Sequence, residues 1–225
     1  MIIVSCNPVY TKVTATFWEA GGDTSVAWDT KGNAYFDCQV FDRGVPAATN
    51  PDMSSGIYVF RSTQNNGASW NFPGHPAAVS SASGQRNTDQ WWQWSAFTKA
   101  GKLAVSYYDR QYGNDETTGN MDFSLSGSIN NPMNFAVVRV TSSSMPLTTQ
   151  FPDAQGNSLF FGDYTGLDVA NNTAYPIWMD TRTKDLALCP GTGAPGVPPQ
   201  VCTFTEPNGL KANDQEIFMA KVSIP

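Results

Sequence analysis

One phrase recurs three times along the chain and constrains the fold more than any other feature of the sequence. The copies read SVAWDTKGNAYFDCQVFDR from Ser25, WSAFTKAGKLAVSYYDR from Trp94 and GLDVANNTAYPIWMDTR from Gly166. Each has a short apolar run, a polar turn, a second apolar run, and then Asp and Arg close together. The same place in the turn is held by Gly32, Gly101 and Asn172, 69 and 71 residues apart. A repeat of this length fits one four-stranded sheet with its loops, which indicates a radial array of sheets.

The rest of the chain predicts strands and turns but no helices. Apolar residues nowhere recur at helical spacing over three turns with a cap before them. Short β-branched and aromatic runs alternate instead with Gly, Asn, Asp and Pro. The expected strands are 11–18, 24–29, 33–41, 56–62, 90–97, 102–108, 120–126, 134–141, 165–170, 173–179 and 215–223. The expected loops are 44–55, 110–119, 142–157 and 184–213.

These strands predict an all-β fold of β-propeller blades, each blade an antiparallel four-stranded sheet. We expect one module over residues 1–225, with repeats at about 24–88, 89–157 and 158–225. The segment 11–18 is a candidate for an outer strand missing from the last repeat. Known propellers have about four to eight blades, so three blades would form half of a six-bladed ring. A second copy, giving a homodimer, or another half of a longer chain would complete it.

The charge balance excludes several classes of partner. Lys and Arg total 13 against 19 Asp and Glu, which gives a formal charge of −6. Nucleic acid needs a basic face, and the sequence has no basic run. No stretch is long and apolar enough for membrane insertion. The abundance of Asn, Thr, Ser and Gly is typical of a secreted or cell-surface protein, although no signal peptide is present in this sequence.

The four cysteines lack the spacing of a zinc site or a redox pair. Cys189 and Cys202 bracket CPGTGAPGVPPQVC, a stretch that cannot pack a core of its own. A disulfide between them would constrain this loop in the unfolded state and stabilise the fold by roughly 3 kcal/mol. We therefore predict this bridge in preference to two free buried thiols. Pairing of Cys6 with Cys38 remains open, because Cys38 lies inside an apolar strand.

Several chemistries are disfavoured by the residues present. His75 is the only histidine, which excludes a His-rich zinc site and leaves one candidate for a Ser-His-Asp triad. Neither a phosphate loop nor a dinucleotide-binding glycine motif occurs. Hard oxygen ligands for a structural calcium ion are present at Asn114, Asp115, Glu116, Asn120 and Asp122, without EF-hand spacing. We prefer to interpret this segment as a solvated acidic loop, and so expect no cofactor and no metal site.

One end of the sheets is expected to gather polar and aromatic side chains. Antiparallel pairing brings the start of a first strand and the end of a second strand to the same end of a sheet. The first-strand starts hold Asp89, Gln90, Trp91, Trp92, Asp163 and Tyr164, and the second-strand ends hold Asp42, Arg43, Asp109, Arg110, Asp180 and Arg182. Rings stack on sugar faces, and planar charged groups bind hydroxyls or a carboxylate. This end therefore suits a carbohydrate or glycoprotein partner.

The segment TQNNGASW resembles the Asp-box of the sialidase-like (BNR-repeat) propeller superfamily, whose pattern is Ser-x-Asp-x-Gly-x-Thr-Trp. The five defining positions are held by Thr63, Asn65, Gly67, Ser69 and Trp70. The phrases FFGDYTGLDV…AYPIWMDTR and DQWWQWSAF…LAVSYYDR look like blade openings and second strands of the same superfamily. The resemblance covers roughly residues 24 to 182. It implies a sialidase-like propeller that acts on glycans.

The resemblance also implies a mechanism in which arginines hold a substrate carboxylate, a Tyr is the nucleophile and an Asp is the acid/base. The candidate substrate-binding residues are Arg43, Arg110, Arg182, Trp91, Trp92 and Asp180. The candidate nucleophile is Tyr164 or Tyr108, and the candidate acid is Asp89, Asp109 or Asp163. The family's Arg-Ile-Pro motif has no counterpart here, and no Glu lies beside a Tyr within the repeats.

Three functions therefore stay open: an exo-acting glycoside hydrolase or part of one, a non-catalytic module that binds glycan or protein, and a scaffold unit that completes its ring by self-association. The Asp and Arg neighbours also have a structural interpretation as ion pairs, and their recurrence favours it. Among the tryptophans, we expect Trp94 to pack between sheets; exposure of Trp91 or Trp92 is the alternative to core packing, and core packing is slightly favoured.

Overall fold

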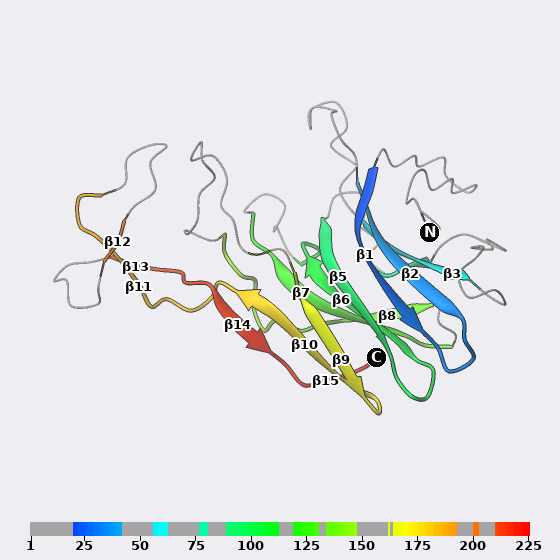
Figure 1. Cartoon of the computed structure of the whole chain (residues 1–225). Coiled ribbons are helices and arrows are strands. Elements are labelled where there is room, and N and C mark those ends of the chain that lie inside the picture. Colours follow the sequence, from blue (N-terminus) through cyan, green and yellow to red (C-terminus); the bar gives the residue numbers. More distant parts are fainter. Residues whose placement is uncertain are drawn as a thin grey trace.

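A computed structural model describes residues 20–41, 56–62, 77–80, 89–112, 119–130, 134–147, 162, 164–192, 200–202 and 210–225. Within these ranges the fold is all-β, with three antiparallel sheets standing side by side in chain order and a smaller fourth sheet beside them (Figure 1). The described part contains no helix that could cross a membrane. The predicted strand 11–18 lies outside the described residues.

The first two sheets are four-stranded meanders, in which each strand pairs with the next along the chain. The first contains β1 (Ala20–Trp28), β2 (Ala34–Phe41), β3 (Gly56–Ser62) and β4 (Ala77–Ala78) in that order. The second contains β5 (Gln90–Phe97), β6 (Leu103–Asp109), β7 (Asp122–Ser128) and β8 (Phe135–Arg139). Such meanders are the sheets of β-propeller blades. The bounds of β3 and β5 are those predicted, whereas most others shift by a few residues.

The third sheet is built on β10. It contains β9 (Gly166–Ala170), β10 (Thr173–Asp180), β14 (Glu216–Met219) and β15 (Val222–Ser223). One edge of β10 pairs with β9, and the other edge pairs with β14 and β15. Between those two, the amide of Ala220 donates to the Pro176 carbonyl at 3.2 Å, so β14 and β15 are two parts of one edge.

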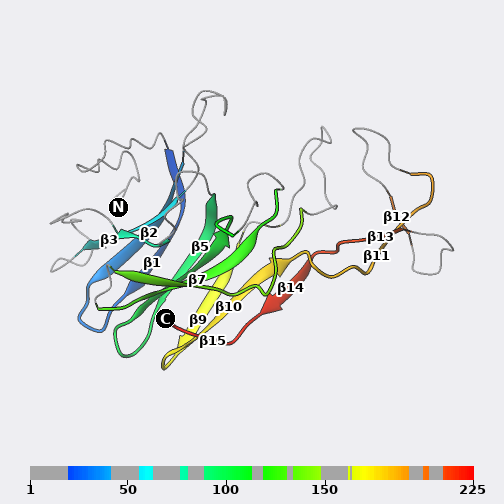
Figure 2. The ribbon, with the colours of Figure 1, turned by 180° about the vertical axis from the view of Figure 1, so that it is seen from behind.

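The predicted loop 184–213 is wrong in part, because it contains a small sheet. This sheet has the order β12-β11-β13, with β11 (Leu186–Leu188), β12 (Val201–Cys202) and β13 (Leu210–Ala212). The predicted disulfide between Cys189 and Cys202 is confirmed, with a Cα–Cα distance of 5.1 Å. Figures 1 and 2 show this sheet projecting beyond the third sheet, away from the first two. Cys38 is also disulfide-bonded, and the question of its pairing with Cys6 lies outside the described residues.

The core lies between the sheets, and β6 shows how the alternation of a strand produces it. Leu103, Val105 and Tyr107 pack toward the first sheet, against residues such as Tyr35. Ala104 and Tyr108 point the other way and pack with residues of the third sheet. Every residue of β6 is buried, because both faces of this strand are covered. Along one edge of the stack, β1 contacts β5 and β5 contacts β9, as inner strands of neighbouring blades do.

The turn after each first strand requires a left-handed residue. Gly32 and Gly101 have φ angles of +80° and +85° in two turns with the same hydrogen bonds. In the third turn, Asn171 takes this conformation with φ of +56°. The prediction that Asn172 is the equivalent of Gly32 and Gly101 is therefore wrong by one residue. The reason is that Ala170 pairs directly with Thr173, which makes this turn one residue shorter than the others.

Two first strands contain a bulge at the same place in the repeat. The register of β1 shifts between Gly22 and Ser25, and that of β5 shifts between Trp91 and Trp94. The bulges contain Asp23 and Trp92, with φ of +43° and +50°. Bulges re-aim side chains and strengthen local twist.

Each bulge also connects its sheet to the next one. The side-chain amide Nε2 of Gln93 on β5 donates to the backbone carbonyl of Asp23. The hydroxyl of Thr165, just before β9, donates to the Trp92 carbonyl at 2.8 Å. These side-chain hydrogen bonds fix the offset of neighbouring sheets along the direction of their strands.

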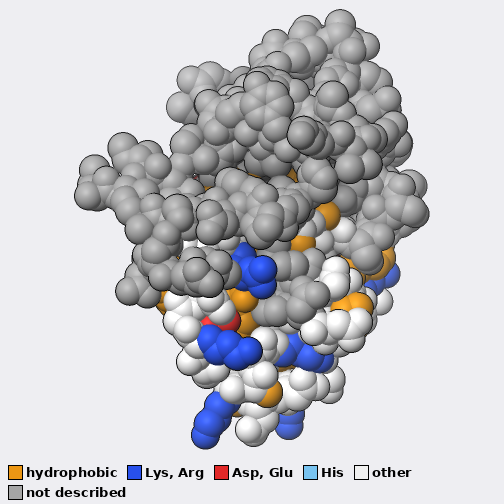
Figure 3. Space-filling view, turned by 90° about the vertical axis from the view of Figure 1, so that its right-hand side faces the viewer, with side chains coloured by type: hydrophobic (Ala, Val, Ile, Leu, Met, Phe, Trp, Pro, Cys, Tyr) orange, Lys and Arg blue, Asp and Glu red, His pale blue; other side chains and the backbone are white. Residues whose placement is uncertain are grey.

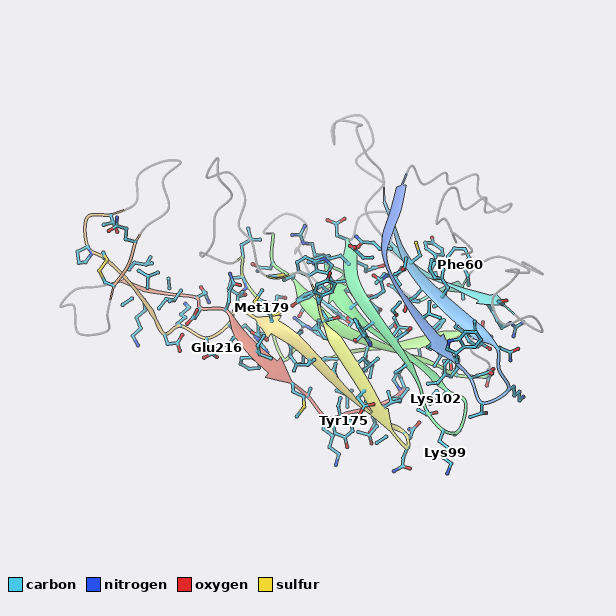
Figure 4. All side chains as sticks on the ribbon, viewed as in Figure 1. Phe60, Lys99, Lys102, Tyr175, Met179 and Glu216 are labelled. Carbon is cyan, nitrogen blue, oxygen red and sulfur yellow. A yellow bond between two sulfur atoms is a disulfide. The ribbon has the colours of Figure 1, made fainter. Side chains whose placement is uncertain are left out.

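The strands of the three sheets run between two ends of the molecule, and these two ends carry different side chains. At the hairpin end, which is the lower end in Figure 1, lie the β1–β2, β5–β6 and β9–β10 turns. Figure 3 shows Lys and Arg side chains toward this end, and Figure 4 labels Lys99 and Lys102 there. At the opposite end, β5, β7 and β9 begin and β6 and β10 finish. We call it the ion-pair end for the reason given next.

Candidate functional site

Strand pairing brings the predicted site residues of the second and third sheets together at the ion-pair end. Gln90 pairs with Asp109 across β5 and β6, and Asp109 pairs with Asp122 across β6 and β7. The third sheet is joined to this end through the hydroxyl of Tyr108, which contacts the backbone of Met179. In these two sheets, the start of the first strand and the end of the second strand therefore lie at the same end, as antiparallel pairing predicts.

Among the described residues three ion pairs lie at this end, and the first joins Arg110 to Asp89. Their side chains meet at 3.2 Å, and the Arg110 amide donates to the Asp89 carbonyl at 3.1 Å. The guanidinium lies 5.2 Å from the centre of the Trp91 ring. A cation over an aromatic face is attracted by the ring quadrupole. Arg110 thus pairs with Asp89 rather than with its neighbour Asp109.

The second ion pair joins Arg139 to Asp122 at 2.7 Å. Asp122 is fully buried and also accepts hydrogen bonds from the hydroxyls of Thr141 and Ser144. The guanidinium of Arg139 lies 4.7 Å from the centre of the Tyr112 ring. Because these groups already satisfy Asp122, its carboxylate is held as part of the protein framework.

The third ion pair joins Arg182 to Asp180 at 2.7 Å. Asp180 is buried and accepts a further hydrogen bond from the indole of Trp178 at 3.0 Å. The hydrogen bond to Asp180 raises the pKa of Arg182. Its guanidinium also donates to the Ser142 hydroxyl and lies 5.7 Å from the Phe218 ring centre. The three Asp–Arg–aromatic clusters thus repeat one arrangement.

Arg139 is the functional candidate that the sequence did not single out. It lies at the end of β8, whereas the rule that gathers site residues covers only the first and second strands of each repeat. From the sequence, Asp122 was considered only as a possible calcium ligand. A signal was present in the alternation of β7 and β8, since an Asp that begins one strand and an Arg that ends its antiparallel neighbour fall at the same end of a sheet.

Asp109 lies beneath the clusters and is fully buried. It accepts hydrogen bonds from the backbone and side chain of Gln111 and from the Ser124 hydroxyl, the last at 2.9 Å. Burial raises the pKa of Asp109 to about 6, although these hydrogen bonds act in the opposite direction. A carboxyl group with this pKa exchanges its proton near neutral pH.

The two candidate tyrosines have opposite environments. The hydroxyl of Tyr108 is buried, donates to the Met179 carbonyl at 2.8 Å and accepts from the Met179 amide at 3.0 Å. Burial raises the pKa of Tyr108 well above its usual value. Tyr164 is 83% exposed just before β9. Of the two, Tyr164 is therefore the side chain that a ligand can reach.

Of the tryptophans, Trp94 differs from expectation, whereas Trp91 and Trp92 show the slightly favoured core packing. Trp91 stacks on Tyr108 with ring centres 5.5 Å apart, and Trp92 meets the same ring edge-on. Both are half-buried, whereas Trp94 is 41% exposed. The bulge between Trp91 and Trp94 explains the change, because it turns Trp91 and Trp92 onto the aromatic core shared with Trp178.

Several predicted residues cannot be placed in this arrangement. Those outside the described residues are Asp42, Arg43, Asp163, the Asp-box residues Thr63, Asn65, Gly67, Ser69 and Trp70, and the calcium candidates Asn114, Asp115 and Glu116. Within the described ranges, no group of three His, Cys, Asp or Glu side chains could hold a metal ion.

No protein-family model and no curated protein matches the chain. One similar solved structure is an endo-arabinase from Bacteroides thetaiotaomicron VPI-5482, with 13% identity, a TM-score of 0.41, and coverage of 85% of this chain and 58% of that one. Another is a BT0996 RGII complex, with 14% identity, a TM-score of 0.40, and coverage of 77% and 46%. The chain thus spans about half the length of the solved structures it resembles.

Proposed function

We propose that this chain is a glycan-directed propeller module that binds carbohydrate at the ion-pair end. The observation that supports the proposal is the set of partly exposed guanidinium groups that the clusters hold at this end, at Arg110, Arg139 and Arg182, with side chains 22%, 32% and 22% exposed. The carboxylates of Asp122 and Asp180 are fully buried and fix their arginines from below, whereas the carboxylate of Asp89 is itself 34% exposed. Sugar hydroxyls accept hydrogen bonds from fixed donors of this kind, and rings beside them can stack on sugar faces.

The charges of the clusters favour neutral sugars over sialic acid. Every guanidinium of the three clusters is already paired with a carboxylate, and the side chains of Arg110 and Arg182 are each 22% exposed. A substrate carboxylate would have to compete with Asp89 or Asp180 for its arginine. Hydroxyl groups need only the outward donors and acceptors that remain. The sialidase-specific interpretation, with Arg43 as third arginine and Asp163 as acid, is accordingly the less favoured form of the proposal.

Tyr164 provides the sharpest test of binding. Its exposed ring lies next to Thr165, which bonds the second sheet, and its removal leaves the core untouched. We expect Tyr164→Ala to weaken binding to an array of neutral oligosaccharides by roughly tenfold, since one stacking ring contributes about 1 kcal/mol or more. The matched control is Ile129→Ala, which removes a 52% exposed side chain at the hairpin end and should bind as the parent does. Equal affinities of the two variants would contradict the proposal.

Glycoside hydrolysis is the second candidate, and the observation that favours it is the carboxylate of Asp89, which is 34% exposed at the end of the sheets that also holds the exposed Tyr164. A general acid must lie within hydrogen-bond reach of the substrate, which Asp89 can do and the fully buried Asp109 cannot. The assay is release of a chromogenic leaving group from a panel of neutral and sialylated glycosides, with Asp89→Asn expected to be inactive. Binding without release from any member of the panel would leave the non-catalytic module.

A further inference from the structure

The carboxyl group of Asp109 is fully buried at the end of β6, directly before the segment that carries Arg110. Its Oδ1 accepts a hydrogen bond from the backbone amide of Gln111 at 3.0 Å, and its Oδ2 accepts one from the side-chain amide of the same residue. An aspartate that bonds the amide two residues further on closes a tight turn of the backbone. Arg110 therefore stands between two residues that are tied to each other.

A second path of hydrogen bonds leads from the same carboxyl group to Arg139. The Ser124 hydroxyl donates to Oδ2 of Asp109 at 2.9 Å, and the hydroxyl oxygens of Ser124 and Tyr112 lie 3.1 Å apart. Because Ser124 has a single hydroxyl hydrogen and gives it to Asp109, the Tyr112 hydroxyl donates to Ser124. The Tyr112 ring held in this way is the ring that lies 4.7 Å from the guanidinium of Arg139.

The third guanidinium at this end is held by other groups. Arg182 bonds to Asp180 and to the Ser142 hydroxyl, and it lies over the Phe218 ring. It therefore serves as an internal reference for the other two arginines.

We propose that Asp109 is a positioning residue of the ion-pair end, which fixes residues 110–112 from below and through them orients the guanidinium groups of Arg110 and Arg139. Asp109 is buried and does not touch the carbohydrate itself. Its effect on binding rests on the carbohydrate site proposed above, whereas its control of the two guanidinium groups does not.

This positioning depends on the ionised form of Asp109. Two donors from Gln111 and one from Ser124 converge on its two oxygens, and a proton on either oxygen takes the place of an accepted hydrogen bond. Burial raises the pKa of Asp109 to about 6, although these hydrogen bonds act in the opposite direction. We therefore expect the two guanidinium groups to be well ordered above about pH 7 and to become less ordered as the pH falls through about 6.

The tyrosines close to Asp109 do not titrate in this range. Burial raises the pKa of Tyr107, on β6, and of Tyr112 above the usual value of 10.0. The uncharged neighbours are Gln90 on β5, its bonded partner Ser80, and Ser124 on β7. The charged neighbours are Asp122, which pairs with Arg139, and Arg110, which pairs with Asp89.

The test follows the Nε–Hε signals of Arg110, Arg139 and Arg182 by NMR as the pH is raised, without any ligand. In the parent, we expect the signals of Arg110 and Arg139 to shift with one midpoint near pH 6, while the signal of Arg182 stays in place. Asp109→Asn should abolish this titration, because the variant has no carboxyl group to ionise. Signals that do not shift in the parent, or that shift equally in Asp109→Asn, would overturn the proposal.

Ser124→Ala separates the two paths. It removes the hydroxyl that links Tyr112 to Asp109 and leaves Gln111 in place, so Arg139 should stop titrating near pH 6 while Arg110 continues. Ser126→Ala, an equal change at an equally buried position two residues along β7, should leave both titrations as in the parent. Unchanged titration of Arg139 in Ser124→Ala would also overturn the proposal.

Binding gives a second readout, with a neutral oligosaccharide that the parent binds on the array. We expect the affinity of the parent to fall about fivefold as the pH is lowered through 6, the size of effect that loss of one hydrogen bond gives. Asp109→Asn should bind this weakly at every pH, and a variant that binds as the parent does above pH 7 would contradict the role of Asp109 in binding. If the parent binds no oligosaccharide, the carbohydrate proposal fails, while the NMR titrations still decide whether Asp109 positions the two arginines.

Discussion

At the residue scale, the buried carboxyl of Asp109 makes stability depend on pH. Burial raises its pKa to about 6 from the usual 3.8, so the folded state favours the protonated form. Its contribution to the free energy of unfolding is therefore fully present below about pH 4 and is lost as pH rises through about 6. A shift of this size corresponds to on the order of 3 kcal/mol.

Asp109→Asn removes that dependence. In urea unfolding between pH 4 and 7, we expect the unfolding free energy of the parent minus that of the variant to fall from pH 4 to about pH 6 and then to level off. Burial also raises the pKa of Asp37, but this affects both proteins equally and cancels in the difference. Ile129→Ala, which removes no ionisable group and lies at an exposed position, should track the parent at every pH. Parallel curves for parent and Asp109→Asn would show that Asp109 titrates normally in the fold.

The hydroxyl of Tyr108 substitutes for a missing strand. β9 pairs with β10 only as far as Ile177, and in the part of the chain that the structure describes the amide and carbonyl of Met179 bond to the hydroxyl of Tyr108 in place of a strand. Tyr108→Phe keeps the ring contacts but leaves both backbone groups buried without a partner. We expect it to lower the free energy of unfolding by about 2 kcal/mol in chemical denaturation. Tyr164→Phe should change it by less than about 0.5 kcal/mol, and an equal effect of the two would refute this role.

At the element scale, the turns that connect the first and second strands of each sheet set the length of each hairpin. Gly101 has φ of +85°, and a Cβ added there would meet no atom within 4 Å. The cost of Gly101→Ala is therefore that of the backbone alone, and we expect a loss of about 1 kcal/mol in thermal unfolding. Gly101→Asn should cost less, because Asn adopts this conformation more readily and Asn171 does so in the third hairpin. Identical melting temperatures for the parent and Gly101→Ala would contradict the assignment.

Elements with strong alternation were predictable from the sequence, and short ones were not. β3 and β5 match their predicted bounds because apolar and aromatic runs end there at turn residues. The sheet β11–β13 was missed because its strands are only two or three residues long and lie among Pro and Gly. Pairing and a disulfide, rather than propensity, hold them. The bulges at Asp23 and Trp92 were also missed. An extra residue shifts the phase of a period-two pattern, but AGGDTSVAW and QWWQWSAF alternate too weakly around the bulge for this shift to be seen.

At the scale of the whole molecule, strand order predicts which end gathers the site, but contacts between sheets decide its pairs. The sequence placed Asp89, Arg110, Asp180 and Arg182 at one end of their sheets, where the structure has them. It did not pair Arg110 with Asp89, because that contact depends on how the loops leave β5 and β6. Nor did it find Arg139, whose partner lies on the neighbouring strand. Pairings across strands require the register, which composition and spacing do not supply.

The most direct test of carbohydrate binding at the ion-pair end is hydrogen–deuterium exchange with and without a neutral oligosaccharide bound by the parent on the array. We predict slower exchange at 89–92, 110–112, 142–144 and 180–183, the segments that carry or adjoin the Asp–Arg–aromatic clusters. Exchange in the β1–β2 and β5–β6 turns at the hairpin end should stay unchanged. Protection confined to the hairpin end, or no array member bound at all, would contradict the account.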